Sequence, residues 1–233
     1  MRQNCEDLNL KDLETLRAYL AEDILAASPK LLGCTLVRGD LRAQIVEVEA
    51  YTWDDPGCHA YNRTAMKNMA MYGRAGTAYV YFTYGNHWML NVVGDIDGRA
   101  GAVLIRGAMP IAGHDVFWSR RPKAGSERGL LSGPGKIAAA FDIDSRLNQI
   151  DLLDPRSELH IELGSKEVRV GLSRRIGIAP GKGDELIRRY VDLDLIEWAT
   201  KSPFNREALA GAIKKTLAPF QSPAKSSLVP TLA

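Results

Sequence analysis

The residue types best suited to chemistry are concentrated between Gln44 and Asn91. This stretch holds four carboxylates, two of the four histidines and six of the eight tyrosines of the 233-residue chain. Its first part alternates in the manner of a strand, so that Glu47, Glu49 and Tyr51 share one face. A carboxylate can activate water and stabilise a positively charged sugar, which is the chemistry of N-glycosidic bond hydrolysis. The alternation offers Glu47 and Glu49 equally for this role.

A second feature is a pair of β-rich runs between Thr77 and Val93, separated by the turn dipeptide Gly85-Asn86. Tyr84 would stand at the tip of this hairpin, with Tyr79 and Tyr81 behind it. A projecting ring and an acid among aromatic faces suit an enzyme that flips a nucleobase out of a duplex and stacks it. Tyrosine is also an ordinary strand residue, and an aromatic stripe of this kind is more often part of a core than a stacking platform.

Hydrophobic spacing predicts the elements that would position these residues. Val46, Val48 and Ala50 should face one side of the strand, opposite the acids and Tyr51. The other expected elements are a helix over 8–27, a hairpin of strands 32–38 and 42–51, a strand over 101–105, a loop over 114–130, and a helix over 137–141 capped near Ser132 or Gly133, with Pro134 in its first turn. No internal repeat or linker divides the chain.

Composition limits the class of protein. No apolar run is long enough to span a membrane, and Met1-Arg2 leads into a polar segment rather than a signal peptide. The three cysteines are an odd number without metal-type spacing, so we expect reduced thiols in the cytosol. Residues 61–140 carry 10 basic and 4 acidic side chains, which favours a nucleic-acid backbone there, although a solvated basic surface would have the same composition.

Several motifs together resemble one family. VEVEAY, CHAYN, MYGRAGTAYVYFTYGNHWMLNVV, GAVLIRG and SGPGKIAAAFDI occur in the order and spacing of the alkyladenine (3-methyladenine) DNA glycosylases of mammals and many bacteria. The resemblance covers about residues 13–205. It implies an α+β fold, a single domain over residues 1–220 with a curved, mainly antiparallel sheet flanked by helices. Residues 221–233 read as a disordered tail. We expect a monomer that acts on double-stranded DNA containing damaged purines, without a cofactor or a metal.

The resemblance also assigns roles to residues. It favours Glu49 over Glu47 as the general base and places Tyr84 in the gap left by the flipped nucleotide. Asn91 matches a residue thought to reject the amine of normal guanine. The expected base pocket consists of Tyr51, His59, Tyr81, Asn91 and Arg106.

Other positions are less well defined by the resemblance. Lys67 and Lys136 are candidate phosphate contacts. Residues 65–68 and Asn86 depart from the family pattern, which leaves the loop around Lys67 and the neighbours of Tyr84 open. The nearby Asp54, Asp55, Cys58 and His59 do not have the spacing of a metal site. The basic segments 173–178 and 187–190 suit either the edge of a DNA groove or exposed edge strands.

The expected chemistry is simple hydrolysis. No lysine lies beside Glu49 in the sequence to form a Schiff base, so water is the expected nucleophile and an abasic site the expected product. A cationic alkylated purine should stack well on tyrosine and leave readily. A neutral deaminated purine such as hypoxanthine would need a proton from a donor that the sequence does not identify. The alternatives are a catalytically silent module that binds damaged DNA and a hydrolase of free nucleosides.

Overall fold

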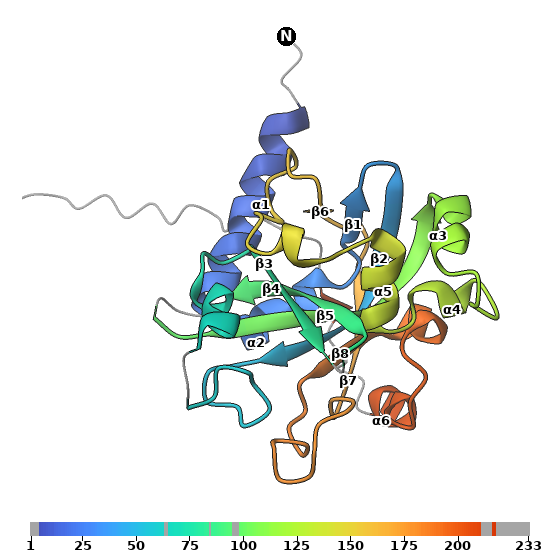
Figure 1. Cartoon of the computed structure of the whole chain (residues 1–233). Helices are drawn as coiled ribbons and strands as arrows, with labels where there is room; N and C mark the ends of the chain where they lie inside the picture. Colours follow the sequence, from blue (N-terminus) through green and yellow to red (C-terminus); the bar gives the residue numbers. More distant parts are fainter. Residues whose placement is uncertain (1–4, 63–64, 84, 95–97, 211–215, 218–233) are drawn as a thin grey trace, which may run out of the picture.

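The computed structural model describes residues 5–62, 65–83, 85–94, 98–210 and 216–217, with the side chains of 5–12, 67 and 216–217 excepted. In these residues an antiparallel sheet is flanked by helices (Figure 1). The strands are β1 Thr35–Arg38, β2 Leu41–Tyr51, β3 Ala78–Thr83, β4 His87–Gly94, β5 Gly101–Ala112, β6 His160–Glu162, β7 Val168–Ser173, β8 Arg189–Asp192 and β9 Thr216–Leu217. The α-helices are α1 Cys5–Glu22, α2 Ile24–Ala27, α3 His114–Arg120, α4 Arg128–Leu131, α5 Pro134–Phe141 and α6 Phe204–Ala210. Short 3-10 helices are η1 Ser28–Leu31, η2 Met66–Tyr72, η3 Ser145–Leu147 and η4 Leu193–Trp198.

The strands follow the order β3-β4-β5-β2-β8-β7-β9, and β1 pairs with β2 and β6. Every pair is antiparallel. The expected α+β fold with a curved, mainly antiparallel sheet is therefore confirmed. The expected tail at 221–233 lies outside the described residues. No helix in the described part of the chain is both long and apolar enough to cross a membrane.

The two faces of the sheet bury different side chains, because neighbouring strand residues point in opposite directions. On one face, Val80, Val92 and Val103 join the main hydrophobic core, over which α1 and α5 pack. On the other face, Tyr79 and Asn91 occupy paired positions of β3 and β4. The first face supplies the core, and the second is available for a site.

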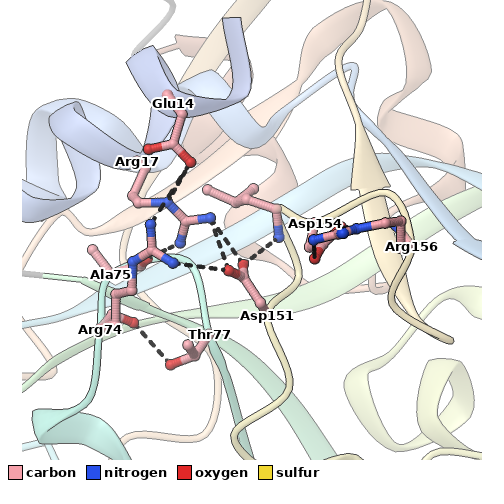
Figure 2. Close-up of polar contacts among 9 residues, drawn as sticks. Glu14, Arg17, Arg74, Ala75, Thr77, Asp151, Asp154 and Arg156 are labelled. Carbon is pink, nitrogen blue, oxygen red and sulfur yellow. Dashed lines mark hydrogen bonds and ion pairs between the residues drawn. The ribbon is translucent and has the colours of Figure 1, made fainter. Parts of the chain in front are cut away.

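Helix α1 is fixed to the sheet by one buried cation as well as by its leucines. Arg17 donates from Nη1 to the carbonyl of Ala75 at 2.6 Å and from Nη2 to both carboxylate oxygens of Asp151 at 3.0 Å. Figure 2 shows Glu14 on the helix and Arg74 on the facing loop completing this cluster. These contacts join three segments that are far apart in the sequence.

Three expectations about the elements were wrong. The helix predicted over 8–27 is two helices, because Asp23 is extended and caps α2 by accepting from the amides of Leu25 and Ala26. Residues 114–130 are not all loop, because α3 occupies the start of this range and α4 begins near its end. Phe117 anchors α3 against Phe141, with ring centroids 5.1 Å apart, and one buried residue in such a short helix gives no visible periodicity.

The third error concerns β2, whose alternation is interrupted by a bulge. Its pairing with β5 shifts between Ile45 and Glu47, so Ile45 rather than Val46 joins Val48 and Ala50 in the main core. Glu47, Glu49 and Tyr51 still share a face. The hairpin predicted from strands 32–38 and 42–51 and the turn predicted at Gly85-Asn86 are both present.

Candidate active site

A cavity of about 310 Å³ opens on the face of the sheet opposite the main core. This volume lies at the lower end of the range of about 300–1,000 Å³ that is typical of small-molecule sites. Four rings contribute to its wall: Tyr51, His59, Tyr79 and Tyr81. The remaining lining residues are Gly57, Met71, Thr83, Met89, Asn91, Ala102, Leu104, Arg106, Pro134, Ile176, Gly177 and Ile178.

Strand alternation brings the aromatic wall together. Tyr79 and Tyr81 are two residues apart on β3 and therefore point to the same side, where they stack with centroids 5.2 Å apart. Their partners across the hairpin are Asn91 and Met89, which also line the cavity. His59 meets Tyr81 edge to face at 4.5 Å. The result is a narrow space bounded by ring faces and edges.

Polar contacts hold two of these residues in place. The Nδ1 atom of His59 lies 3.0 Å from the hydroxyl of Tyr79, and the amide of Asn91 donates to the carbonyl of Tyr79 at 3.0 Å. Burial raises the pKa of Tyr79, so its hydroxyl keeps its proton at neutral pH. All five residues expected in the base pocket line this one cavity.

Glu49 lies directly behind the cavity wall. Its carboxylate is fully buried and accepts hydrogen bonds from the Tyr51 hydroxyl at 2.8 Å, Arg106 Nη1 at 3.2 Å and the Ile176 amide at 2.7 Å. All three donors belong to residues that line the cavity, whereas Glu49 itself does not line it. One layer of hydrogen-bonding groups therefore separates the carboxylate from the cavity.

Glu47 shares the same strand face but has other partners. It accepts from Arg189 Nε at 2.7 Å and from the Thr200 amide at 2.6 Å, and neither residue lines the cavity. Burial alone would raise the pKa of Glu47, but the charges of Arg189 and Arg106 outweigh it and lower the pKa. Strand alternation alone does not distinguish the two carboxylates. In the structure, their hydrogen-bond partners differ, and those of Glu49 are the ones that line the cavity.

Arg106 lies between the two acids. Its Nη1 contacts Glu49, and its Nε is 3.4 Å from Glu47 Oε1. Burial would lower the pKa of Arg106, but Glu49 and Glu47 together raise it, so the residue stays a cation. A fixed positive charge therefore lies beside both carboxylates.

For two arginines, the expectation of a DNA-groove edge or an exposed edge strand was wrong. Arg175 and Arg189 are buried, with 2% and 0% of their surface exposed. Arg189 pairs with Glu47, and Arg175 pairs with Asp55. Charge spacing along the chain does not reveal these pairs, because the partners are more than a hundred residues apart. Asp55 is thereby engaged by an arginine, and the described residues hold no metal-type group of three ligands.

Of the three other residues expected to take part, the structure describes only the side chain of Lys136. Lys136 Nζ donates to Ser132 Oγ at 3.2 Å at the start of α5, and burial and Arg121 lower its pKa. Pro134, the first residue of α5, reaches the cavity. Tyr84 and the side chain of Lys67 lie outside the described residues. The roles expected for these three residues stay predictions.

Sequence reasoning missed part of the wall. Tyr79 could have been included, because it shares the strand face of Tyr81. The segment 176–178 carries no chemical side chain and supplies its backbone and aliphatic surface instead, so no residue type marks it. Met71 and Met89 are likewise ordinary apolar residues that only tertiary structure brings to the cavity.

Comparison with known proteins agrees with this geometry. A family model described as Methylpurine-DNA glycosylase matches residues 18–194. A "Putative 3-methyladenine DNA glycosylase" of Carboxydothermus hydrogenoformans is 45% identical over 172 residues, which are 71% of this chain and 89% of that protein. Proteins of the same name from Rhodopseudomonas palustris (41% over 174 residues, 75% of this chain and 84% of that protein) and Chlorobaculum parvum (39% over 197 residues, 82% and 90%) are similar too. The matches extend well beyond the cavity, and the chain therefore belongs to the methylpurine-DNA glycosylase family.

Proposed function

We propose that this protein is a monofunctional DNA N-glycosylase that flips alkylated purines of the 3-methyladenine kind out of duplex DNA and releases them in base excision repair. The observation that carries this proposal is the carboxylate of Glu49, held by three residues of an aromatic cavity. The family and the names of its similar members support a glycosylase acting on methylated purines.

In the proposed reaction a purine occupies the cavity against the tyrosine rings, and its sugar lies toward Glu49. Glu49 accepts a proton from water, the water oxygen bonds to C1′, and the C1′–N bond breaks with its electron pair leaving on the base. A cationic alkylated purine then departs as a neutral base without an added proton. Arg106 orients Glu49 by direct contact, and burial together with the Glu49 charge raises the pKa of Tyr51, which stays a donor.

The other parts of the proposal follow the sequence. Tyr84 would fill the gap in the duplex, Asn91 would reject normal guanine, and Lys67 and Lys136 would contact phosphates. The side chain next to Glu49 on the cavity side is an arginine, Arg106, and not a lysine, which supports water as the nucleophile. We extend the proposal to deaminated purines, to action as a monomer and to independence of metals and cofactors.

The complete burial of Glu49 favours a second candidate, a module that binds damaged DNA without cleaving it. In that case the wall residues would stay between the carboxylate and the base. Catalysis instead requires that Glu49 loses its hydrogen bond to Tyr51, Arg106 or Ile176 when the nucleotide enters.

A panel of duplexes, each with a single damaged base, separates the candidates. The protein is incubated with the duplexes and a chelator, and abasic sites are detected by alkaline cleavage of the strand. We expect release of alkylated purines and a loss of about 10²-fold or more in the single-turnover rate for Glu49→Gln, with duplex binding retained. Binding without any base release by the native protein would contradict the glycosylase and support the silent module. Equal cleavage of free nucleosides would contradict both.

A further inference from the structure

A buried ion pair lies beneath one ring of the cavity wall. The side chains of Asp55 and Arg175 both have 0% exposure, and two hydrogen bonds join them, that from Nη2 to Oδ1 being 2.9 Å long. The guanidinium also donates to the carbonyls of Ala50 and Gly183, each at 3.1 Å. This arrangement fixes the charge of Arg175 in one place.

The guanidinium of Arg175 covers one face of the Tyr51 ring, with its central carbon 4.5 Å from the ring centroid. Tyr51 lines the cavity and Arg175 does not. A base in the cavity therefore meets Tyr51 at its other face or its edge. With ordinary stacking, the centre of that base lies about 8 Å from the guanidinium, with a single ring between them.

A cation at this distance would oppose binding of a purine that is itself positively charged. The carboxylate of Asp55 compensates the charge of Arg175 by direct contact. Arg188 also approaches Asp55, at 3.3 Å, but its side chain is 16% exposed, so solvent screens its charge more. At the hydroxyl of Tyr51, the charges of Glu49 and Arg106 offset each other.

Two glycines border the pair at positions where a side chain would collide with it. A Cβ atom at Gly57 would lie 3.1 Å from Arg175 Nη2, and one at Gly183 would lie 2.9 Å from Asp55 Oδ1. Gly183 also has a φ of +75°, which favours glycine. The backbone around the pair is thus shaped to hold these two side chains in contact.

We propose that Asp55, by compensating the charge of Arg175 under Tyr51, sets how strongly the cavity prefers a cationic purine over an uncharged purine of the same shape. Asp55 and Arg175 act through Tyr51 and are positioning residues for specificity. The proposal rests on the proposed function of the cavity and adds a source for its selectivity.

The test compares two duplexes that differ only in charge at one base. One contains 7-methylguanine, which is cationic in DNA, and the other contains the uncharged isostere 7-deaza-7-methylguanine. Equilibrium dissociation constants for both are measured by fluorescence anisotropy in a Glu49→Gln background, so that the base is retained. The quantity of interest is the ratio of the two constants, because a general loss of folding or of DNA affinity affects both duplexes alike.

Asp55→Asn leaves the Arg175 charge uncompensated and should lower the preference for the cationic duplex roughly thirtyfold, which is the effect of a unit charge at about 8 Å with an effective dielectric constant of about 20. Arg175→Gln has the opposite sign and should raise the preference. The double variant has no unpaired buried charge and should return to within about threefold of the native ratio. Asp154→Asn removes the partner of the exposed Arg156 (Figure 2) and is the control, for which the ratio should not change.

An unchanged ratio in folded Asp55→Asn, or a shift of both single variants in the same direction, would overturn the proposal. If one single variant does not fold, the direction in which the other changes the ratio decides whether the proposal holds. Failure of the proposed function gives another pattern: the native protein would then bind neither modified duplex better than undamaged DNA. Normal selection of 7-methylguanine by the native protein with no effect of Asp55→Asn rejects the charge compensation alone.

Discussion

At the residue scale, the site depends on charges that are buried and paired rather than exposed. Glu47, Glu49, Arg106 and Arg189 form a continuous group in which each acid contacts an arginine. Removing one partner from such a group is strongly destabilising, because the other charge stays buried without compensation. Only Glu49 has all its partners in the cavity wall, and Arg106 lines the cavity itself, so Glu47 and Arg189 should affect stability more than chemistry.

Glu47→Gln tests this distinction through pH. The pKa of Glu47 lies below its ordinary value of 4.5, so its stabilising effect is complete above about pH 4.5 and is lost as the pH falls through the lowered pKa. The variant should lose about 3 kcal/mol of unfolding free energy at pH 7 and show a weaker loss of stability below pH 4.5 than the native protein. Urea unfolding between pH 3 and pH 7 measures both.

Glu158→Gln is the control for this experiment, because Glu158 is paired with Arg38 but has 62% of its side chain exposed. Its unfolding free energy should change by less than about 1 kcal/mol. Parallel pH profiles for Glu47→Gln and the native protein would show that the Glu47 pair does not carry this acid sensitivity.

At the element scale, sequence patterns predicted the hairpins that carry the site but not the contacts between elements. Gly85-Asn86 and the Tyr79–Tyr81 alternation are local signals, and both hold in the structure. The bulge at Val46 and the helices within 114–130 depend on pairing with β5 and on burial of Phe117, which no local window contains. The positions of site residues were therefore predictable where a turn or strand alternation determines them.

The packing of α5 against the start of β4 leads to a testable prediction. A Cβ atom at Gly135 would lie 2.8 Å from His87 Cγ, close to the main chain of β4. Gly135→Ala should displace the hairpin that carries Tyr81 and lower the excision rate about tenfold, because small misplacements near reacting groups have large effects. The unfolding free energy of this variant should fall only slightly, because a gain of about 1 kcal/mol from helix propensity offsets part of a packing loss of about 1–3 kcal/mol.

Gly125→Ala is the matched control, because no atom lies within 4 Å of its added Cβ. Its melting temperature and its single-turnover rate should equal those of the native protein. A Gly135→Ala protein with native kinetics would mean that β4 accommodates the methyl group without moving the hairpin.

At the scale of the whole molecule, the charge distribution is divided between a buried part and a surface part. The sequence shows a basic middle third, but Arg106 lies in that third and is buried in the site. Arg175 and Arg189, which lie in later basic segments, are buried too. Counting charges along the chain therefore overstates the surface available to DNA, and only burial separates the two groups.

Lys136 lies at the start of α5, beside the Pro134 edge of the cavity, and is half-buried. If it contacts a phosphate, Lys136→Gln should weaken binding to all duplex sequences alike and reduce the slope of log affinity against log salt by about 0.9. Lys166→Gln, an exposed lysine next to β7, should leave the slope unchanged. Equal slopes for Lys136→Gln and the native protein would place the DNA backbone away from α5, and the basic middle third would then be an ordinary solvated surface at this position.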